Sequence, residues 1–118
     1  MNLDLKNFFF ANLNDLATVV ITAPKSKDDL LRQIYAGLQT ATECGLNWDA
    51  LDEMLQDLSW IKQKDIVLIH ENLDSLSKED KNIYAEILGS AAEYWKGKRK
   101  HRIFFIVPES MRNALSSE

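Results

Sequence analysis

The amino-acid sequence predicts an α/β fold: a three-stranded parallel sheet with crossover helices packed on it. Three short apolar runs, rich in β-branched and aromatic residues, have the composition of buried strands. They occupy residues 17–22, 65–69 and 103–107. Helical segments separate the runs and are long enough to return the chain for parallel pairing. Continuous apolar runs of this kind are expected where both faces of a sheet are covered.

The first strand is followed by a predicted helix that begins at Ser26. Ala23 and Pro24 end the strand, and Ser26 with Asp29 three residues later forms a weak capping box. Apolar residues then recur at helical spacing, at Leu31, Ile34, Tyr35 and Leu38. These positions predict one buried face.

Two further helices are predicted, the first just before the second strand and the second between the second and third strands. Asn47 is a good N-cap for a helix at about 48–58, and Ser77, with Asp80 three residues on, begins another. The inward stripe of the first of these is Leu51, Met54, Leu55 and Leu58. The buried side of the second is Ile83, Tyr84, Ile87, Leu88, Ala91 and Trp95. Pro108 closes the third strand.

The whole chain, residues 1–118, is predicted to form a single domain with a core at about 17–107. A chain of 118 residues can build one hydrophobic core and is too short for two ordinary domains. Residues 1–16 form an N-terminal extension that fits either a short helix or an irregular segment over a sheet edge. The tail, 108–118, fits either one helical turn or a frayed end.

Composition excludes several classes of protein. A hydrophobic fraction of 46% with four Gly and two Pro excludes collagen-like and disordered chains. No apolar run approaches the roughly 20 residues that span a bilayer, and the N-terminus has no small-residue cleavage site of a secretory signal. The single cysteine, Cys44, excludes an internal disulfide and a multi-cysteine metal site. A soluble cytoplasmic protein with no membrane partner is expected.

The net charge of −4 is distributed unevenly. Between Arg32 and Lys62 there is no Lys, Arg or His, whereas residues 96–102 include five Lys or Arg. The acids of the first interval are Glu43, Asp49, Asp52, Glu53 and Asp57. The basic run is interpreted as a solvated loop, because Trp95 is its only aromatic neighbour, and no direct contact with nucleic acid is expected.

The acids of the helix at 48–58 share one face. Asp49, Asp52, Glu53 and Gln56 fall at i, i+3, i+4 and i+7, opposite the Leu/Met stripe. One interpretation is a solvated face, favoured by the helix dipole near the first turn. Against it, like-charge neighbours cost roughly 0.2–0.5 kcal/mol per pair, and no Lys is interleaved. The pattern therefore favours a surface that binds a positively charged partner.

Catalytic and metal-binding interpretations are weaker. A catalytic carboxylate pair needs one acid in an apolar pocket, and this face offers no such asymmetry. Cys44 with His70 or His101 could supply a nucleophile and a base, but their spacing matches no known signature. No glycine-rich phosphate loop and no cluster of metal ligands is evident. A protein without enzymatic activity, cofactor or metal is expected.

Residues 45–53, G-L-N-W-D-A-L-D-E, resemble the G-x-N-x-D-A-L-x-[DE] segment of the barstar family, the cytoplasmic inhibitors of barnase-type ribonucleases. The predicted order of strands and helices agrees with that family over about residues 17–107. The resemblance implies a barstar-like fold and a non-enzymatic inhibitor or immunity protein. Such a protein would block the cationic active site of a ribonuclease or nuclease toxin with an acidic loop and helix, at about 43–57. A general protein-interaction module of the same fold is the alternative.

The resemblance also implies roles for single residues. In the family the closing acid of the motif mimics an RNA phosphate; Glu53 holds that position, Asp49 matches a second acidic contact, and Asp57 is expected at the rim. Gly45 and Asn47 match the loop glycine and helix cap. The implied partner-binding residues are Glu43, Gly45, Asn47, Trp48, Asp49, Asp52, Glu53 and Gln56.

The sequence departs from the family prototype at three places. Aromatic residues of the prototype are replaced by Glu43, Cys44 and Asp52. An acidic contact on the third helix of the prototype falls near Lys96, which would be a reversal of charge. We therefore expect a ribonuclease or nuclease other than barnase itself as the partner.

Overall fold

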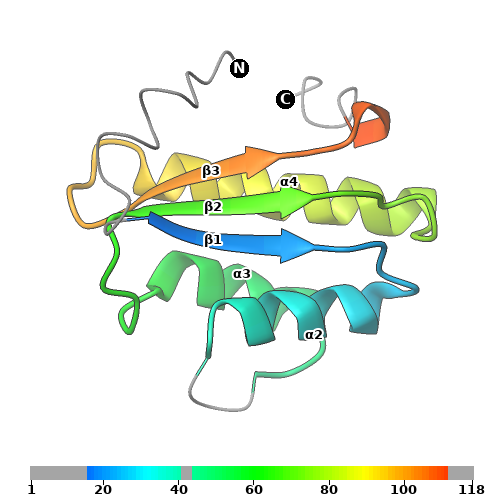
Figure 1. Cartoon of the computed structure of the whole chain (residues 1–118), viewed down its shortest axis with the longest axis horizontal. Helices are drawn as coiled ribbons and strands as arrows, with labels where there is room; N and C mark the ends of the chain where they lie inside the picture. The colour runs from blue at the N-terminus through cyan, green and yellow to red at the C-terminus, as the bar shows by residue number, and fades with distance from the viewer. Residues whose placement is uncertain (1–15, 41–43, 112–118) are drawn as a thin grey trace.

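The computed structural model describes residues 16–40 and 44–111. Its elements, in chain order, are β1 (Leu16–Ile21), α2 (Lys27–Gly37), α3 (Trp48–Asp57), β2 (Asp65–His70), α4 (Lys78–Trp95), β3 (Arg102–Ile106) and a 3₁₀ turn (Glu109–Met111) (Figure 1). The predicted extension at 1–16 lies outside the described residues, apart from Leu16, which begins β1. The tail beyond the 3₁₀ turn also lies outside them.

The three described strands form one parallel sheet in the order β1-β2-β3. Asp65 of β2 pairs with Leu16 on one side and with Arg102 on the other. This arrangement confirms the predicted α/β fold class. The first and third strands begin one residue earlier than predicted, because Leu16 and Arg102 join the ladder through their pairing with Asp65.

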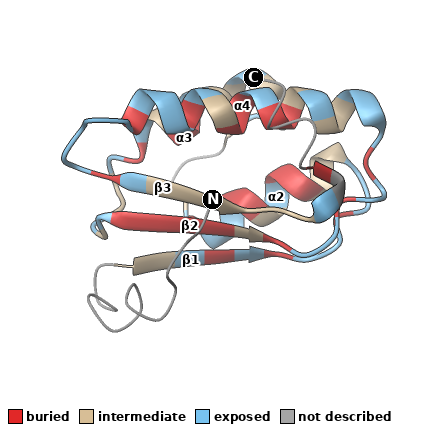
Figure 2. Cartoon of the chain, turned by 90° about the horizontal axis from the view of Figure 1, so that it is seen from above, coloured by how far each residue is buried: buried red, intermediate tan, exposed pale blue. Residues whose placement is uncertain are grey.

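All three described helices lie on one side of the sheet (Figures 1 and 2). Along β1 the side chains alternate, so that Val19 and Ile21 are buried beneath the helices while Val20 is 50% exposed on the other face. The expectation that both faces are covered is therefore not met by the described helices. The central strand β2 pairs on both edges, and all its residues are buried except the half-buried Ile69, in agreement with its continuous apolar sequence.

The core lies between the sheet and the three helices. Trp95 at the end of α4 donates its indole N–H to the carbonyl of Leu55 at 2.8 Å, and a ring nitrogen of His101 contacts the carbonyl of Leu58 at 3.0 Å. The fully buried side chains of the core include Leu30, Leu31, Ile34, Leu51, Leu55, Ile66, Leu68 and Leu88. The C-terminal end of α3 is thus held by both α4 and the segment that leads into β3.

Glycine at position 37 lets α2 approach β1 closely. A Cβ atom at Gly37 would lie 2.3 Å from Cγ1 of Val19, which is far inside van der Waals contact. The helix ends at this residue, and Leu38 just beyond it is buried in the same core.

The predicted N-caps of all three helices are confirmed. The Ser26 hydroxyl accepts from the Asp29 N–H at 3.2 Å, and the Ser77 hydroxyl accepts from the Asp80 N–H at 3.0 Å. Asn47 Oδ1 accepts from the Ala50 N–H at 2.8 Å. Each cap satisfies a backbone donor that the first turn of a helix leaves unpaired.

Candidate functional site

The loop before α3 is fixed against α2. The hydroxyl group of Tyr35 donates a hydrogen bond to the carbonyl oxygen of Gly45 at 2.8 Å. Burial, with a smaller contribution from Cys44, raises the pKa of Tyr35 to about 12, so this hydroxyl keeps its proton at neutral pH. A Cβ at Gly45 would lie 2.5 Å from Nδ2 of Asn47. Glycine at 45 therefore leaves the space in which the Asn47 side chain caps the helix.

The polar side of α3 contains an exposed row of acids. Asp49, Glu53 and Asp57 are exposed and lie at successive turns of the helix. The only ion pair among residues 16–40 and 44–111 joins Arg102 to Asp65, so no described cation neutralises this row through a salt bridge. Asp49 and Glu53, two of the residues that helical spacing placed on the outer face, are thus exposed together with Asp57.

Asp52 and Gln56 lie on the flank of this row. Both side chains are half-buried, and Nε2 of Gln56 donates a hydrogen bond to Oδ1 of Asp52 at 3.1 Å. The sequence placed both residues on the same outer face as Asp49 and Glu53. In the structure one acceptor atom of Asp52 is already engaged within the helix, which leaves it less available to a partner.

A hollow of about 490 Å³ lies beside the acidic row. Of the described residues that line it, two are acids, Glu53 and Asp57, and none is a cation. The other lining residues are Cys44, Gly45, Ala50, Met54 and Trp60. The indole N–H of Trp60 donates to the carbonyl of Leu38 at 2.8 Å, which holds this ring in place.

Sequence reasoning placed Asp57 only at the rim of the surface and did not name Ala50 or Trp60 among the partner-binding residues. Helical spacing offered a signal for the first two, because Ala50, Glu53 and Asp57 fall at i, i+3 and i+7. Trp60 gave no such signal, since it joins the hollow through the turn after α3. That turn begins at Leu58, which adopts a left-handed conformation with φ of 48°.

Trp48 contributes to packing as well as to the surface. Its half-buried ring stacks on the ring of Tyr84 in α4, with centroids 6.2 Å apart and an interplanar angle of 30°. The start of α3 is thereby anchored on α4. Glu43, the first of the predicted partner-binding residues, lies outside the described residues.

The two histidines are engaged by the fold. Nδ1 of His70 contacts the carbonyl oxygen of Ile106 at 2.9 Å, and Nε2 contacts the hydroxyl of Tyr84 at 2.5 Å. Both ring nitrogens of His101 contact carbonyl oxygens, those of Gln63 and Leu58. Neither ring has a nitrogen left over for proton transfer to a ligand. Within the described ranges, no group of three or more His, Cys, Asp or Glu residues is placed to hold a metal ion.

Comparison with protein families matches residues 14–108 to the model described as Barstar (barnase inhibitor). The chain belongs to the barstar family. Members of this family are inhibitors rather than enzymes, and membership implies the general role of a barnase-type ribonuclease inhibitor with a protein partner such as a ribonuclease. No curated protein and no solved structure matches the chain.

The barstar match extends slightly beyond the residues 17–107 that carried the sequence resemblance. It includes all three described strands and all three described helices. Among the residues that the structure describes, no helix is long and apolar enough to cross a membrane.

Proposed function

We propose that this barstar-family protein inhibits a ribonuclease or nuclease toxin by covering its cationic active site with α3 and the loop before it. The observation that supports the proposal most directly is the exposed row of Asp49, Glu53 and Asp57. None of these acids has a salt-bridge partner within the described parts of the chain.

The chemistry of nucleases suits such a surface. Their active sites concentrate Lys, Arg and His side chains that hold the phosphate groups of the substrate. A carboxylate can replace a phosphate there, because it accepts short charge-assisted hydrogen bonds from the same donors. An uncompensated acidic surface also steers a cationic partner into the encounter.

The hollow beside Glu53 supports a more specific proposal for the contact. Its apolar side chains, among them Met54 and Trp60, lie next to the carboxylates of Glu53 and Asp57. A long cationic side chain has an apolar stem and a charged head, so it matches both parts of this lining. An Arg or Lys of the nuclease is therefore proposed to enter the hollow.

The loop before α3 and the start of α3 are preorganised for binding by contacts within the protein. Asn47 caps the helix, Tyr35 holds the loop at Gly45, and Trp48 packs on α4. A site whose geometry is already fixed loses less conformational entropy on association.

The proposal is tested by capturing partners on the immobilised protein and assaying whatever is bound for nuclease activity. The matched control is a Glu53→Ala/Asp57→Ala variant, in which two exposed side chains are truncated and the fold is left intact. We expect the wild-type protein to capture a nuclease and inhibit it at equimolar ratio, and the variant to lose both properties. A captured protein without nuclease activity, lost in the same variant, would instead favour a general interaction module.

A further inference from the structure

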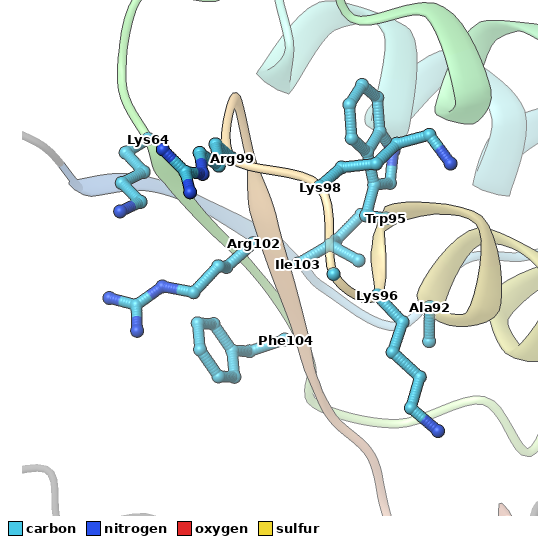
Figure 3. Close-up of a pocket in the computed structure, with 10 residues that line it drawn as sticks. Lys64, Ala92, Trp95, Lys96, Lys98, Arg99, Arg102, Ile103 and Phe104 are labelled. Atoms are coloured by element: carbon cyan, nitrogen blue, oxygen red, sulfur yellow. The ribbon is translucent and has the colours of Figure 1, made fainter.

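A second charged surface lies at the start of β3, away from the acidic row of α3. It is a hollow of about 440 Å³, which we call the basic hollow, between the end of α4 and the beginning of β3 (Figure 3). Among the described residues that line it, the cations are Lys64, Lys96, Lys98, Arg99 and Arg102, and none is Asp or Glu. The volume falls in the range typical of ligand sites, roughly 300–1,000 Å³.

The fold assembles this hollow from segments that are distant in sequence. The backbone N–H of Arg102 donates to the carbonyl of Lys64 at 2.8 Å, which brings the residue before β2 next to the first residue of β3. The loop between α4 and β3 supplies the remaining cations. This loop turns at Gly97, whose φ is 79° and whose missing Cβ would meet no atom within 4 Å.

The charges in the hollow are only partly compensated. Arg102 forms a two-point ion pair with the buried carboxylate of Asp65, with N–O distances of 2.7 and 2.9 Å. Lys98 donates to the carbonyl of Tyr94 at 2.6 Å and lies 4.1 Å from the centre of its ring. Lys64, Lys96 and Arg99 take part in no ion pair with any described residue. An anion bound here would meet three cations that no described carboxylate neutralises.

The cations do not converge on one point. In Figure 3, Lys64, Arg99 and Arg102 extend on one side of β3, whereas Lys96 extends on the other side. A single compact ion could contact only part of this set. An extended chain of phosphates could pass across β3 and contact both groups.

The hollow also has apolar walls. Ile103 and Trp95 lie on the side of α4, where Trp95 belongs to the core and is only 6% exposed, and the half-buried ring of Phe104 lies 5.9 Å from the guanidinium carbon of Arg102. Single strands expose the flat faces of their bases, which pack on apolar and aromatic surfaces, whereas a duplex hides them. The combination of scattered cations and apolar walls is thus closer to a single-strand site than to a duplex site.

We propose that the basic hollow binds the phosphate backbone of single-stranded nucleic acid. This differs from the sequence expectation of a solvated loop without nucleic acid contact. That expectation rests on Trp95 as the only aromatic residue next to residues 96–102. The structure adds Lys64, Ile103 and Phe104 to the same hollow. The basic hollow shares no residue with the acidic row, so this proposal can be tested independently of the inhibitory role.

The test measures fluorescence anisotropy of a labelled oligouridine as the full-length protein is added at low salt. The site variant is Lys64→Ala/Arg99→Ala, and the matched control is Lys25→Ala/Arg32→Ala, which removes two exposed cations from the segment around the start of α2. All four side chains are exposed, so the melting temperature of each variant should stay unchanged.

We expect the wild type and the control to bind the oligouridine and the site variant to lose about ten-fold or more in affinity. Each phosphate contact in a single strand contributes about 0.7 to the slope of log affinity against log salt, so the site variant should lose about 1.4 of that slope. Equal affinities of the site variant and the control, or no binding at low salt, would overturn the proposal. If a duplex or inorganic triphosphate bound to the same residues as tightly as the oligouridine, the preference of the hollow for single strands would be disproved.

Discussion

The hydroxyl group of Tyr84 donates a hydrogen bond to Nε2 of His70, deep between α4 and the end of β2. The Ile106 carbonyl can only accept, so Nδ1 donates to it, and in a neutral ring Nε2 then carries no proton and accepts from Tyr84. His70 is 3% exposed, and burial lowers its pKa, against a smaller opposite effect of the bond to Ile106. The native state thus holds a neutral imidazole.

The first prediction concerns stability and pH. The pKa of His70 in the folded protein is lowered below the unfolded value of about 6.5. The unfolded state therefore binds more protons as the pH falls below about 6.5, and the stability that the neutral ring contributes is lost in that direction. We expect the free energy of unfolding, measured by urea denaturation, to exceed that of His70→Gln by more at pH ~7.5 than at pH ~5. Because all other titrating groups are common to both proteins, a difference that stays constant with pH would contradict the assignment.

A second prediction concerns the close packing of α2 on β1. Adding a methyl group in Gly37→Ala ordinarily favours a helix by roughly 0.5–1 kcal/mol. Here the new Cβ would meet Val19 at 2.3 Å, so we expect a net loss of about 1–3 kcal/mol in the free energy of unfolding. Val19→Ala removes the obstructing methyl groups, and the double variant should lose less than the sum of the two single losses. A neutral or stabilising Gly37→Ala would show that the helix does not approach the strand this closely.

Local features of the fold were predictable because they depend on neighbours in the sequence. Ser26, Asn47 and Ser77 were identified as N-caps from their side chains and from the helical spacing that follows each one. The strands were identified from their apolar runs, although the pairing of Asp65 with Arg102 moved the start of β3 by one residue. Such pairing joins residues 37 positions apart, and no local pattern encodes it.

The candidate site was predictable only in part, for the same reason. The acidic side of α3 follows from helical spacing, whereas its division into an exposed row and a half-buried flank depends on how α3 packs on its neighbours. Trp60 reaches the hollow through the turn after Leu58, and Lys64 reaches the basic hollow through a backbone contact with Arg102. Tertiary contacts of this kind decide which side chains share a surface.

A third prediction concerns Cys44, the residue on which an enzymatic role would depend. Its half-buried side chain lines the hollow beside α3, where it packs as a small apolar group. We expect Cys44→Ala to lower stability modestly and to leave inhibition and partner affinity within about two-fold of wild type, as measured by calorimetric titration. Loss of biological activity in a Cys44→Ala protein that still folds would instead point to nucleophilic catalysis.

The fourth prediction concerns the rate of association. If the exposed acids steer the encounter with a cationic partner, the association rate constant should fall steeply as salt rises beyond physiological strength, where the Debye length is about 8 Å. The Asp49→Asn/Glu53→Gln/Asp57→Asn variant keeps the shapes of the side chains and removes their charges. Stopped-flow measurements should give this variant a slower and less salt-dependent association. Equal salt dependence in both proteins would show that α3 does not steer the encounter.

The final prediction ranks the acids of α3. Glu53 lies at the centre of the exposed row and lines the hollow. The sequence resemblance also predicts that it takes the phosphate-mimicking position of the family. A carboxylate that is desolvated among cations leaves them unpaired when it is truncated, so Glu53→Ala should weaken binding by about 2–5 kcal/mol, mainly through faster dissociation.

The neighbours of Glu53 should rank below it. Asp49 and Asp57 lie one turn before and one turn after Glu53. Changing either to Ala should lower the free energy of partner binding by less than Glu53→Ala does. Asp52→Ala should cause the smallest loss of binding free energy, because the Asp52 carboxylate already accepts a hydrogen bond from Gln56 on the half-buried flank. Surface plasmon resonance gives the dissociation rates, and Asp74→Ala, an exposed acid outside α3, serves as the control.

Two outcomes would revise this ranking in different ways. Helical spacing predicts Asp57 at the rim of the interface, one turn beyond Glu53, whereas the structure places it on the same hollow as Glu53. An Asp57→Ala loss equal to that of Glu53→Ala would move the centre of the interface to the hollow, because only a desolvated carboxylate costs that much. An Asp52→Ala loss larger than that of Glu53→Ala would show that the partner docks on the half-buried flank of the helix. The roles carried over from the family to Glu53 and Asp49 would then be wrong, even though the fold is that of the family.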